Sequence, residues 1–207
     1  MEDLARHWNQ VFTGREDEAL GWYEGDVGQT LGFLDMIPGG PAGTALLPGA
    51  GTSRLVDELL SRGMSLVLND VSDAALSRLR GRIGDRADGL TWIRQDISRP
   101  LPTDIPQVDL WADRAVLHFL VDEADIEGYF GNLRSALKPG GHVLLAEFSE
   151  AGAPRCAGLD VHRYTADEMA RRLGGEYTLV KAEDYVFTNP AGAARPYVYA
   201  LFRRVGG

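Results

Sequence analysis

Cysteine, basic residues and long hydrophobic runs are all scarce in this sequence. Its 207 residues include one cysteine, Cys156, which cannot form an internal disulfide, so a reducing cytoplasm is the expected compartment. No apolar run approaches the roughly 20 residues of a membrane span, and residues 1–4 lack the basic start of a signal peptide. The 21 Lys and Arg against 30 Asp and Glu give a net charge of −9, which disfavours nucleic-acid binding. We therefore predict neither a membrane nor a nucleic acid as partner.

Metal-binding and hydrolase motifs are missing as well. The four histidines are not paired at metal-ligand spacing, and a single Cys makes no thiolate cluster. No Gly-x-Ser-x-Gly segment supplies a hydrolase nucleophile. The sequence therefore predicts chemistry without a metal ion.

What is present is a globular composition with an excess of glycine. The chain is 44% hydrophobic and 25% charged, and its length suits one domain. Its 25 glycines gather at segment ends, as expected for an α/β protein with many tight turns. We predict a single domain over residues 1–207, with an N-terminal helical lid region at 1–40 and a core at 41–207.

Apolar runs alternate with amphipathic stretches along the chain. The apolar runs predict strands at residues 44–47, 64–69, 90–94, 108–112 and 142–148. The amphipathic stretches predict helices at 3–12, 26–37, 54–61, 72–83 and 122–137, and a capping box at Thr165 opens a last one. The β-rich segments 177–188 and 195–204 are expected to be antiparallel. This order predicts an α/β, Rossmann-like, mostly parallel seven-stranded sheet with helices on both faces and a C-terminal antiparallel hairpin.

Ligands of such sheets bind at the carboxyl ends of the strands. The first strand is followed by Gly49, Ala50 and Gly51, where two glycines let the backbone pass close to a ligand ahead of a helix. A plain strand-to-helix turn is the alternative interpretation. Arg54 stands where a dinucleotide fingerprint has its third glycine, which counts against a nicotinamide-dependent oxidoreductase, a further alternative.

Acidic residues follow the next two strands. Asp70, with Val71 beside it, lies 19 residues after Gly51, an offset at which a carboxylate can accept hydrogen bonds from ribose hydroxyls. Asp96 can accept from an exocyclic amine, and Ile97 offers an apolar wall and a backbone N–H. A helix cap and a surface loop acid are the alternative roles of the two carboxylates. Together with the glycine turn, these residues suit the tail, ribose and adenine of one ligand.

On these residues the chain resembles the class I S-adenosylmethionine-dependent methyltransferases over essentially residues 1–205. The run Leu137–Gly141 before the fifth strand and the closing hairpin are typical of that family. Segments 7–8, 21–23 and 113–120 resemble small bacterial methyltransferases of undefined substrate, and the tryptophans resemble those of elongation-factor lysine methyltransferases and of thiol and halide methyltransferases. The resemblance implies S-adenosylmethionine as cofactor, S-adenosylhomocysteine as product, and a small-molecule acceptor methylated on O, N or S.

The chain departs from the family pattern at Leu47. The family usually has Asp or Glu there, which helps to hold the cofactor's amino group, so another acid, Glu24 or Asp113, is needed. The same departure favours a non-catalytic protein that binds S-adenosylmethionine or S-adenosylhomocysteine as one alternative. The net charge of −9 permits methylation of a protein lysine as another.

The resemblance implies that the segment after the fourth strand faces the transferred methyl group. Asp113 and Arg114 are therefore candidate cofactor-binding residues, and Asp113 and His118 are candidate catalytic residues. We hypothesise that His118 orients or deprotonates the acceptor, with a packed structural histidine as the alternative. Arg114 either pairs with Asp113 or binds an anionic substrate.

Aromatic residues near the N-terminus are candidates for a lid. Trp22 is expected to contact the cofactor, because aromatic faces next to a sulfonium gain about 0.5–2 kcal/mol from cation–π attraction. Tyr23, His118 and Arg163 are the candidate substrate residues. Core packing of an N-terminal helix is the alternative for the aromatics, and an exposed polar loop is the alternative for Arg163.

Overall fold

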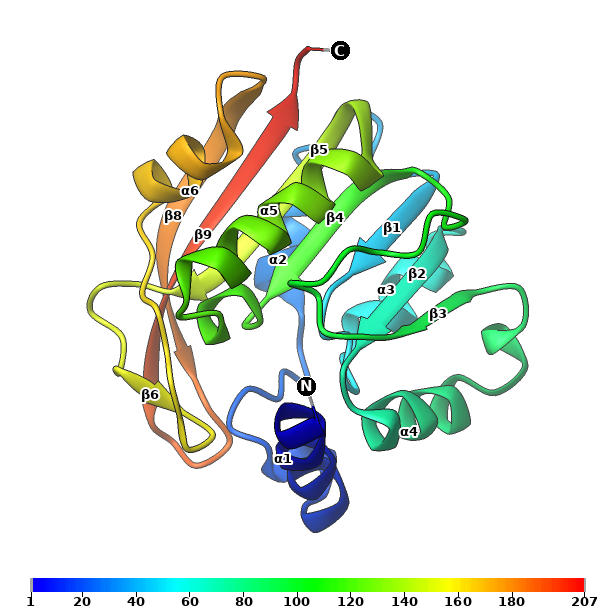
Figure 1. The fold of residues 1–207 in the computed structure, drawn as a ribbon, viewed down its shortest axis with the longest axis vertical. Helices are drawn as coiled ribbons and strands as arrows, with labels where there is room; N and C mark the ends of the chain where they lie inside the picture. Colours follow the sequence, from blue (N-terminus) through cyan, green and yellow to red (C-terminus); the bar gives the residue numbers. More distant parts are fainter. Residues whose placement is uncertain (1, 207) are drawn as a thin grey trace.

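The structure, a computed structural model, describes residues 2–206 and is built around a seven-stranded sheet (Figure 1). The strand order is β3-β2-β1-β4-β5-β9-β8. Strands β1 to β5 pair in parallel, whereas β9 is antiparallel to both of its neighbours. The sheet strands are β1 (Thr44–Leu47), β2 (Ser65–Asp70), β3 (Thr91–Arg94), β4 (Val108–Arg114), β5 (Leu137–Phe148), β8 (Tyr177–Thr188) and β9 (Ala194–Arg204). A separate small hairpin is formed by β6 (Arg155–Cys156) and β7 (Leu159–Asp160).

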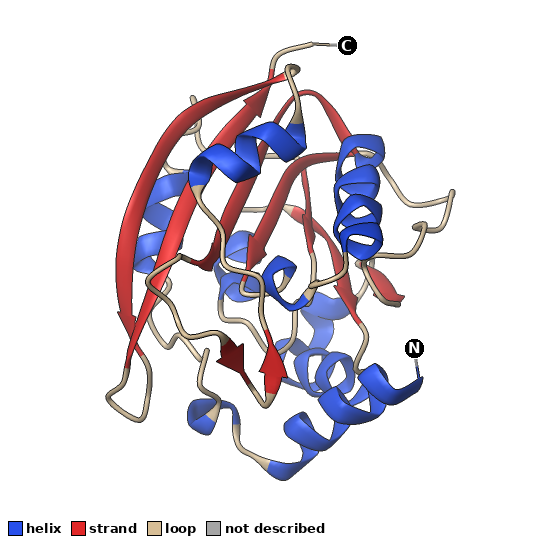
Figure 2. Ribbon diagram, turned by 60° about the vertical axis from the view of Figure 1, so that its left-hand side comes forward, coloured by secondary structure: helices blue, strands red, loops and turns tan. Residues whose placement is uncertain are grey.

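Helices cover both faces of the sheet (Figure 2). The α-helices are α1 (Glu2–Gly14), α2 (Gly28–Leu34), α3 (Leu55–Ser61), α4 (Asp73–Ile83), α5 (Glu123–Ala136) and α6 (Ala166–Leu173). Short 3-10 helices occur at η1 (Asp17–Ala19), η2 (Gly84–Ala87) and η3 (Leu117–Phe119). Among residues 2–206, no helix has the length and apolar character needed to cross a bilayer.

The two faces of the sheet carry alternating residues, because successive side chains of a strand point to opposite sides. In β4 and β5 the odd-numbered residues, such as Trp111 and Val143, pack with α5 and α6. The even-numbered residues, such as Ala112 and Leu144, pack with α2, α3 and α4. Figure 1 shows α5 and α6 on the near face of the sheet. This alternation decides which way each side chain points where β4 and β5 end.

The predicted architecture is confirmed, including the C-terminal antiparallel pair. Strands β1 and β8 have the predicted bounds, and α4 begins after Ser72, whose hydroxyl accepts a hydrogen bond from the Ala75 N–H at 3.1 Å. The predicted capping box at α6 is half formed. The Thr165 hydroxyl accepts from the Glu168 N–H at 3.1 Å, but the Glu168 carboxylate binds His162 and Arg172 instead of returning to Thr165.

Four stretches differ from the prediction. Strand β4 runs to Arg114, two residues beyond the predicted 108–112, so Asp113 and Arg114 belong to the strand and do not follow it. Helix α2 is shorter than residues 26–37 at both ends. It starts at Gly28, whose N–H donates to the Asp26 carboxylate at 2.8 Å, and after Leu34 the N–H groups of Met36 and Ile37 make tighter i→i−3 bonds. Strand β5 begins directly at Leu137, so the run 138–141 lies inside the strand and not in a turn before it; Leu137 pairs with Val108 before the register shifts. The β6–β7 hairpin was not predicted, since two-residue strands leave no periodic signal.

Helix α1 lies at the end of the sheet opposite the C-terminus of the chain, where the parallel strands end (Figure 1). It is fastened to α4 by side chains at two points. The Asn9 side-chain oxygen accepts from the Ser72 hydroxyl at 2.8 Å and from the Ala74 N–H at 3.1 Å. The Arg78 guanidinium donates to the Phe12 carbonyl oxygen at 2.5 Å and pairs with Asp17 at 2.6 Å. These contacts hold α1 across the carboxyl edge of the sheet.

Candidate functional site

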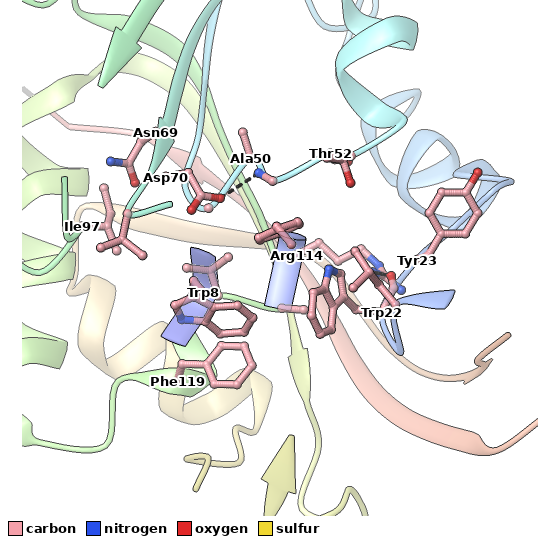
Figure 3. A pocket seen from close by; sticks show the side chains of 18 of the residues that line it. Trp8, Trp22, Tyr23, Ala50, Thr52, Asn69, Asp70, Ile97, Arg114 and Phe119 are labelled. Atoms are coloured by element: carbon pink, nitrogen blue, oxygen red, sulfur yellow. Dashed lines mark hydrogen bonds between the residues drawn. The ribbon is translucent and has the colours of Figure 1, made fainter. Parts of the chain in front are cut away.

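A cavity lies at the carboxyl edge of the sheet, between the turns that follow β1 to β4 and the N-terminal segment. Figure 3 shows Asn69, Asp70 and Ile97 at one end and Trp22, Tyr23 and Arg114 at the other. Trp8 and Phe119 lie across the cavity from Ala50. The candidate residues Gly49, Gly51, Val71 and Asp96 also line it.

The turn after β1 requires glycine at both positions. Gly49 and Gly51 have φ values of 47° and 51°, in the left-handed region that other L-residues rarely adopt. A Cβ on Gly49 would lie 2.4 Å from Cγ2 of Val116, and one on Gly51 would lie 3.3 Å from the Phe12 ring. The Ala50 N–H between them donates to the Asn69 carbonyl oxygen at 2.7 Å. The turn is thus packed between the segment after β4 and helix α1.

Asp70 at the end of β2 joins this turn to helix α4. One carboxylate oxygen accepts from the Gly51 N–H at 2.9 Å, and the other accepts from the Ser72 N–H at 2.8 Å. Burial raises the pKa of Asp70 to about 6, although these backbone donors act against the rise. Asp70 therefore both binds the backbone at the start of α4 and lines the cavity.

Asp96 and Ile97 follow β3 and line the same end of the cavity. One oxygen of Asp96 accepts from both the N–H and the hydroxyl of Ser98, at 2.9 and 2.8 Å. Its other oxygen lies 3.7 Å from Nε of Arg99. Asp96 is 8% exposed, and its bonds to Ser98 set the orientation of the carboxylate before any ligand arrives.

Aromatic rings form the opposite wall of the cavity. Trp8 makes edge contacts with Trp22 at 5.5 Å and with Phe119 at 4.9 Å between ring centroids. Phe12 lies 6.1 Å from Trp22 and completes the group. The rings come from α1, from the segment after it and from η3, so three separate parts of the chain close the cavity over the glycine turn. These rings pack against one another and also line the cavity, so their contacts fit both the predicted lid and the predicted packing role.

Arg114 and Glu24 form an ion pair on the cavity wall, with Nε 2.8 Å from the Glu24 carboxylate. Of the two alternatives for Arg114, pairing with Asp113 is not formed, because adjacent residues of β4 point to opposite faces of the sheet. Burial raises the pKa of Glu24, and Arg114 opposes that rise. The structure thus brings to the cavity one of the two acids considered for the role of the missing acid at Leu47. Leu47 itself is 2% exposed and packs in the core.

Asp113 is buried behind the cavity wall, on the face of the sheet covered by α5. Its carboxylate accepts from the N–H groups of Val116 and Leu117, both at 3.1 Å, and from the Tyr129 hydroxyl at 2.6 Å. Asp113 is 1% exposed and does not line the cavity. Its carboxylate fixes the backbone of the segment after β4, and Val116 of that segment lines the cavity.

His118 also lies outside the cavity lining. The side chain is fully buried, its ring is stacked on Phe148 at 4.7 Å, and its Nδ1 lies 2.8 Å from the Glu147 carboxyl. Burial lowers the pKa of His118 to about 3 and raises the pKa of Glu147 to about 8. At neutral pH the histidine is therefore uncharged and Glu147 keeps its proton. This environment matches the packed structural histidine considered as the alternative.

The candidate substrate residues Tyr23 and Arg163 do not lie together. Tyr23 lines the cavity, whereas Arg163 donates to the carbonyl oxygens of Glu150 and Gly152, at 3.0 and 3.4 Å, and is not part of the lining. Within residues 2–206, no group of three or more His, Cys, Asp or Glu side chains is arranged to hold a metal ion.

Sequence reasoning missed Glu147, which is fully buried between Asp113 and His118. The signal was available, since Glu147 is the one charged residue in the apolar run of β5 from residue 142 to residue 148. It also missed Phe119 as a wall residue, because a phenylalanine carries no polar signal.

The chain is similar in sequence to a methyltransferase family model and to two curated proteins. Residues 48–143 match the family model described as a methyltransferase domain. The chain is 29% identical over 122 residues to phosphoethanolamine N-methyltransferase 1 of Triticum aestivum, covering 58% of this chain and 24% of that protein. It is 28% identical over 116 residues to nodulation protein S of Rhizobium tropici, covering 56% of this chain and 48% of that protein. The matches thus span about a quarter and about half of the lengths of these two relatives.

Among solved structures, the fold is similar to that of Burkholderia thailandensis 1,6-didemethyltoxoflavin-N1-methyltransferase with bound 1,6-didemethyltoxoflavin and S-adenosylhomocysteine. The TM-score is 0.71 at 20% identity, over 99% of this chain and 90% of that one. At this identity the similarity establishes the fold.

Proposed function

We propose that this chain, which is a class I S-adenosylmethionine-dependent methyltransferase by its fold and family model, transfers a methyl group from S-adenosylmethionine to an O, N or S nucleophile of a small molecule. The observation that carries the proposal is the order of groups along the cavity. Asp96 and Ile97 suit an adenine, Asp70 suits a ribose, and the glycine turn leads toward Arg114 and Glu24 (Figure 3).

The residues present fit the cofactor. Asp70 and Asp96 each use carboxylate oxygens to accept from backbone N–H groups, and an oxygen with two lone-pair directions can accept a further hydroxyl or amine. A cavity wall of indole and phenyl rings suits a positively charged sulfonium. In this proposal the cofactor residues are Trp22, Gly49, Ala50, Gly51, Asp70, Val71, Asp96, Ile97 and Arg114.

When bound, the cofactor supplies an electrophilic methyl group on a sulfonium, so the chain's own part is alignment and exclusion of water. The nucleophile's lone pair forms the new bond to carbon as the carbon–sulfur bond breaks, and the electron pair goes to sulfur. Trp8, Trp22 and Phe119 close the cavity on the side facing the glycine turn. The lid expected over residues 1–40 is limited in this proposal to the part before α2, because Phe33 and Leu34 of α2 pack in the core with the sheet strands.

Acid–base help for the acceptor has no support at His118 or Asp113, because neither side chain lines the cavity. In this proposal the acceptor arrives with its lone pair already available, as a neutral amine, a thiolate or a carboxylate does. Tyr23 is the substrate candidate that lies at the cavity, and Arg163 does not share that position. The relatives described as N-methyltransferases support a small-molecule acceptor. The single cysteine supports a reducing, cytoplasmic location in this proposal.

Calorimetry with S-adenosylmethionine and S-adenosylhomocysteine tests the proposal first. We expect saturable binding of both ligands by the wild-type chain and by Asp85→Asn, an exposed control on η2. A screen of amines, thiols and carboxylates for release of S-adenosylhomocysteine then tests transfer. Absence of binding to either ligand would refute the proposal, and binding without turnover on any acceptor or protein extract would favour the non-catalytic alternative.

A further inference from the structure

Arg114 is held more rigidly than its pairing with Glu24 requires. Its guanidinium lies over the Phe187 ring at 4.8 Å and over the Tyr197 ring at 5.0 Å. Nε donates to the Tyr199 hydroxyl at 3.1 Å, and Nη1 donates to the Trp22 carbonyl oxygen at 2.9 Å. The position of the charge is thus fixed from β8, β9 and the N-terminal segment together.

One donor atom of this guanidinium is left over. Nη2 is buried and has no hydrogen-bond partner in the part of the chain that the structure describes. Buried polar groups are nearly always paired, and an unpaired N–H on a charged group is especially unfavourable. Because Arg114 lines the cavity, a ligand there is the natural source of an acceptor, and an anionic group suits a planar guanidinium best.

Glu24 places a carboxylate beside this donor. Its side chain is 7% exposed, lines the cavity and contacts Nε of Arg114, so an acid and a base stand side by side on one wall. A ligand that carries an ammonium and a carboxylate on the same carbon complements such a pair. The other cavity carboxylates, Asp70 and Asp96, already accept backbone N–H groups, and Asp70 lies at the end of the cavity away from Arg114 (Figure 3).

We propose that Glu24 and Arg114 form a clamp for the amino-acid tail of the cofactor, with Glu24 accepting from the ammonium group and Arg114 donating to the carboxylate. The clamp rests on the proposed function. It gives this chain a tail site built on the N-terminal segment and the end of β4, in place of an acid at the end of β1, where Leu47 is buried among core residues. The lid segment and cofactor binding are thereby coupled, because the Trp22 carbonyl and Glu24 both bind Arg114.

Ligands that lack parts of the tail test the clamp directly by calorimetry. The wild-type chain should bind S-adenosylmethionine about 10- to 100-fold more tightly than its decarboxylated analogue, the range expected for one charge-assisted hydrogen bond. Arg114→Lys keeps the charge but loses the fork of donors, and Arg114→Met loses both. Both variants should reduce this preference, whereas 5′-methylthioadenosine, which has no amino-acid tail, should bind them within about 3-fold of wild type.

Glu24→Gln should act on the other half of the tail. It should lower the preference for S-adenosylhomocysteine over its deamino analogue and leave the carboxylate preference largely in place. Arg155→Met and Glu127→Gln, at exposed ion pairs away from the cavity, are the matched controls and should keep all preferences.

The outcomes separate the clamp from the proposed function. If the wild-type chain binds no adenosyl ligand, the proposed function fails. If it binds 5′-methylthioadenosine as tightly as S-adenosylhomocysteine, the clamp fails and the proposed function stands. Equal weakening of tailed and tailless ligands in a folded Arg114→Met chain also overturns the clamp. Should that variant not fold, the ligand comparison on the wild-type chain decides.

Discussion

Two parts of the carboxyl edge of the sheet use carboxylates in opposite ways. After β2 and β3, Asp70 and Asp96 sit on the cavity wall and are held by backbone N–H groups. Within β4 and β5, Asp113 and Glu147 are buried under α5 and hold the segment that forms the wall. The first part suits contact with a ligand, and the second sets the shape of the surface that the ligand meets.

The difference follows from strand alternation. In β4 the side chain of Asp113 shares the face of Trp111, which packs under α5, whereas Arg114 emerges on the side of the cavity. In β5, Glu147 shares the parity of Leu145 and so lies on the same face as Asp113. One residue's difference in position along a strand thus decides whether a side chain faces the cavity or is buried under α5.

The sharpest test of how the two parts meet is Gly49→Ala. Its Cβ would enter the space of Val116, the residue whose N–H is fixed by Asp113, and it would adopt a left-handed conformation. We expect binding of S-adenosylhomocysteine to fall by more than about 100-fold and the free energy of unfolding to fall by about 2–5 kcal/mol. Calorimetry and denaturant unfolding measure these two quantities.

Gly63→Ala is the matched control for Gly49→Ala. Gly63 has a φ of 78°, but its Cβ would meet no atom within 4 Å, so the variant carries the backbone strain without the clash. We expect about 1–2 kcal/mol of destabilisation and unchanged ligand affinity. Equal effects of the two variants on affinity would show that packing against Val116 does not shape the site.

Asp70→Asn tests the ligand-facing part alone. The amide has one acceptor oxygen instead of two, so it cannot serve Gly51, Ser72 and a ribose as the carboxylate can. We expect affinity for S-adenosylhomocysteine to fall about 10- to 100-fold, with 5′-methylthioadenosine affected equally because it carries the same ribose. An unchanged affinity would leave Asp70 with its capping role only.

The wild-type affinity should also depend on pH through Asp70. Its pKa of about 6 means that the carboxylate is ionised above that pH and protonated below it. A protonated carboxyl is a poorer acceptor for hydroxyls, so affinity should decline as the pH falls from 7 to 5. Asp70→Asn should remove this dependence, which calorimetry at several pH values would reveal.

Above about pH 6, where Asp70 is already ionised, stability should depend on pH through the buried part. Glu147 has a pKa of about 8 in the folded chain, against an ordinary value of 4.5, so the folded state holds a proton that the unfolded state releases. Stability from this group is present below pH 4.5 and is lost as the pH rises toward 8. Asp113 acts in the same direction, because burial also raises its pKa.

His118 works against this trend at lower pH. Its pKa of about 3, against an ordinary value of 6.5, means that the unfolded state binds the extra proton, so its contribution grows as the pH rises from 3 to 6.5. Above pH 6.5 His118 no longer contributes to the pH dependence, and Glu147 by itself should lower the free energy of unfolding by about 1–2 kcal/mol between pH 6.5 and 8. Glu147→Gln, measured by urea unfolding across this range, should flatten the decline. A wild-type chain whose stability rises over the same interval would contradict the assignment.

The sequence was informative where function depends on backbone turns and strand order. The glycine pair, Asp70 and Asp96 were found because each directly follows a short apolar strand, and such positions have few alternatives in a doubly wound sheet. The sequence did not show which side chain at the end of β4 points into the cavity. Deciding whether Asp113 or Arg114 faces the cavity requires the register of β4 relative to the helices, which depends on packing with residues far along the chain, such as Tyr129 and Tyr199.

The smallest expected effect on function belongs to His118. An asparagine there removes the ring that stacks on Phe148 and approaches Glu147, so His118→Asn should lower the free energy of unfolding by about 1–3 kcal/mol. Because the ring does not line the cavity, ligand affinity and, once an acceptor is found, kcat should stay within about 3-fold of wild type at a temperature where the variant is folded. The pH profile of kcat between 5 and 8 should keep its shape, since a histidine with a pKa of about 3 does not titrate there. A large loss of kcat in the folded variant, together with a loss of a pH inflection, would restore His118 as the group that handles the acceptor's proton. It would also mean that the segment after β4 opens during turnover and exposes the ring.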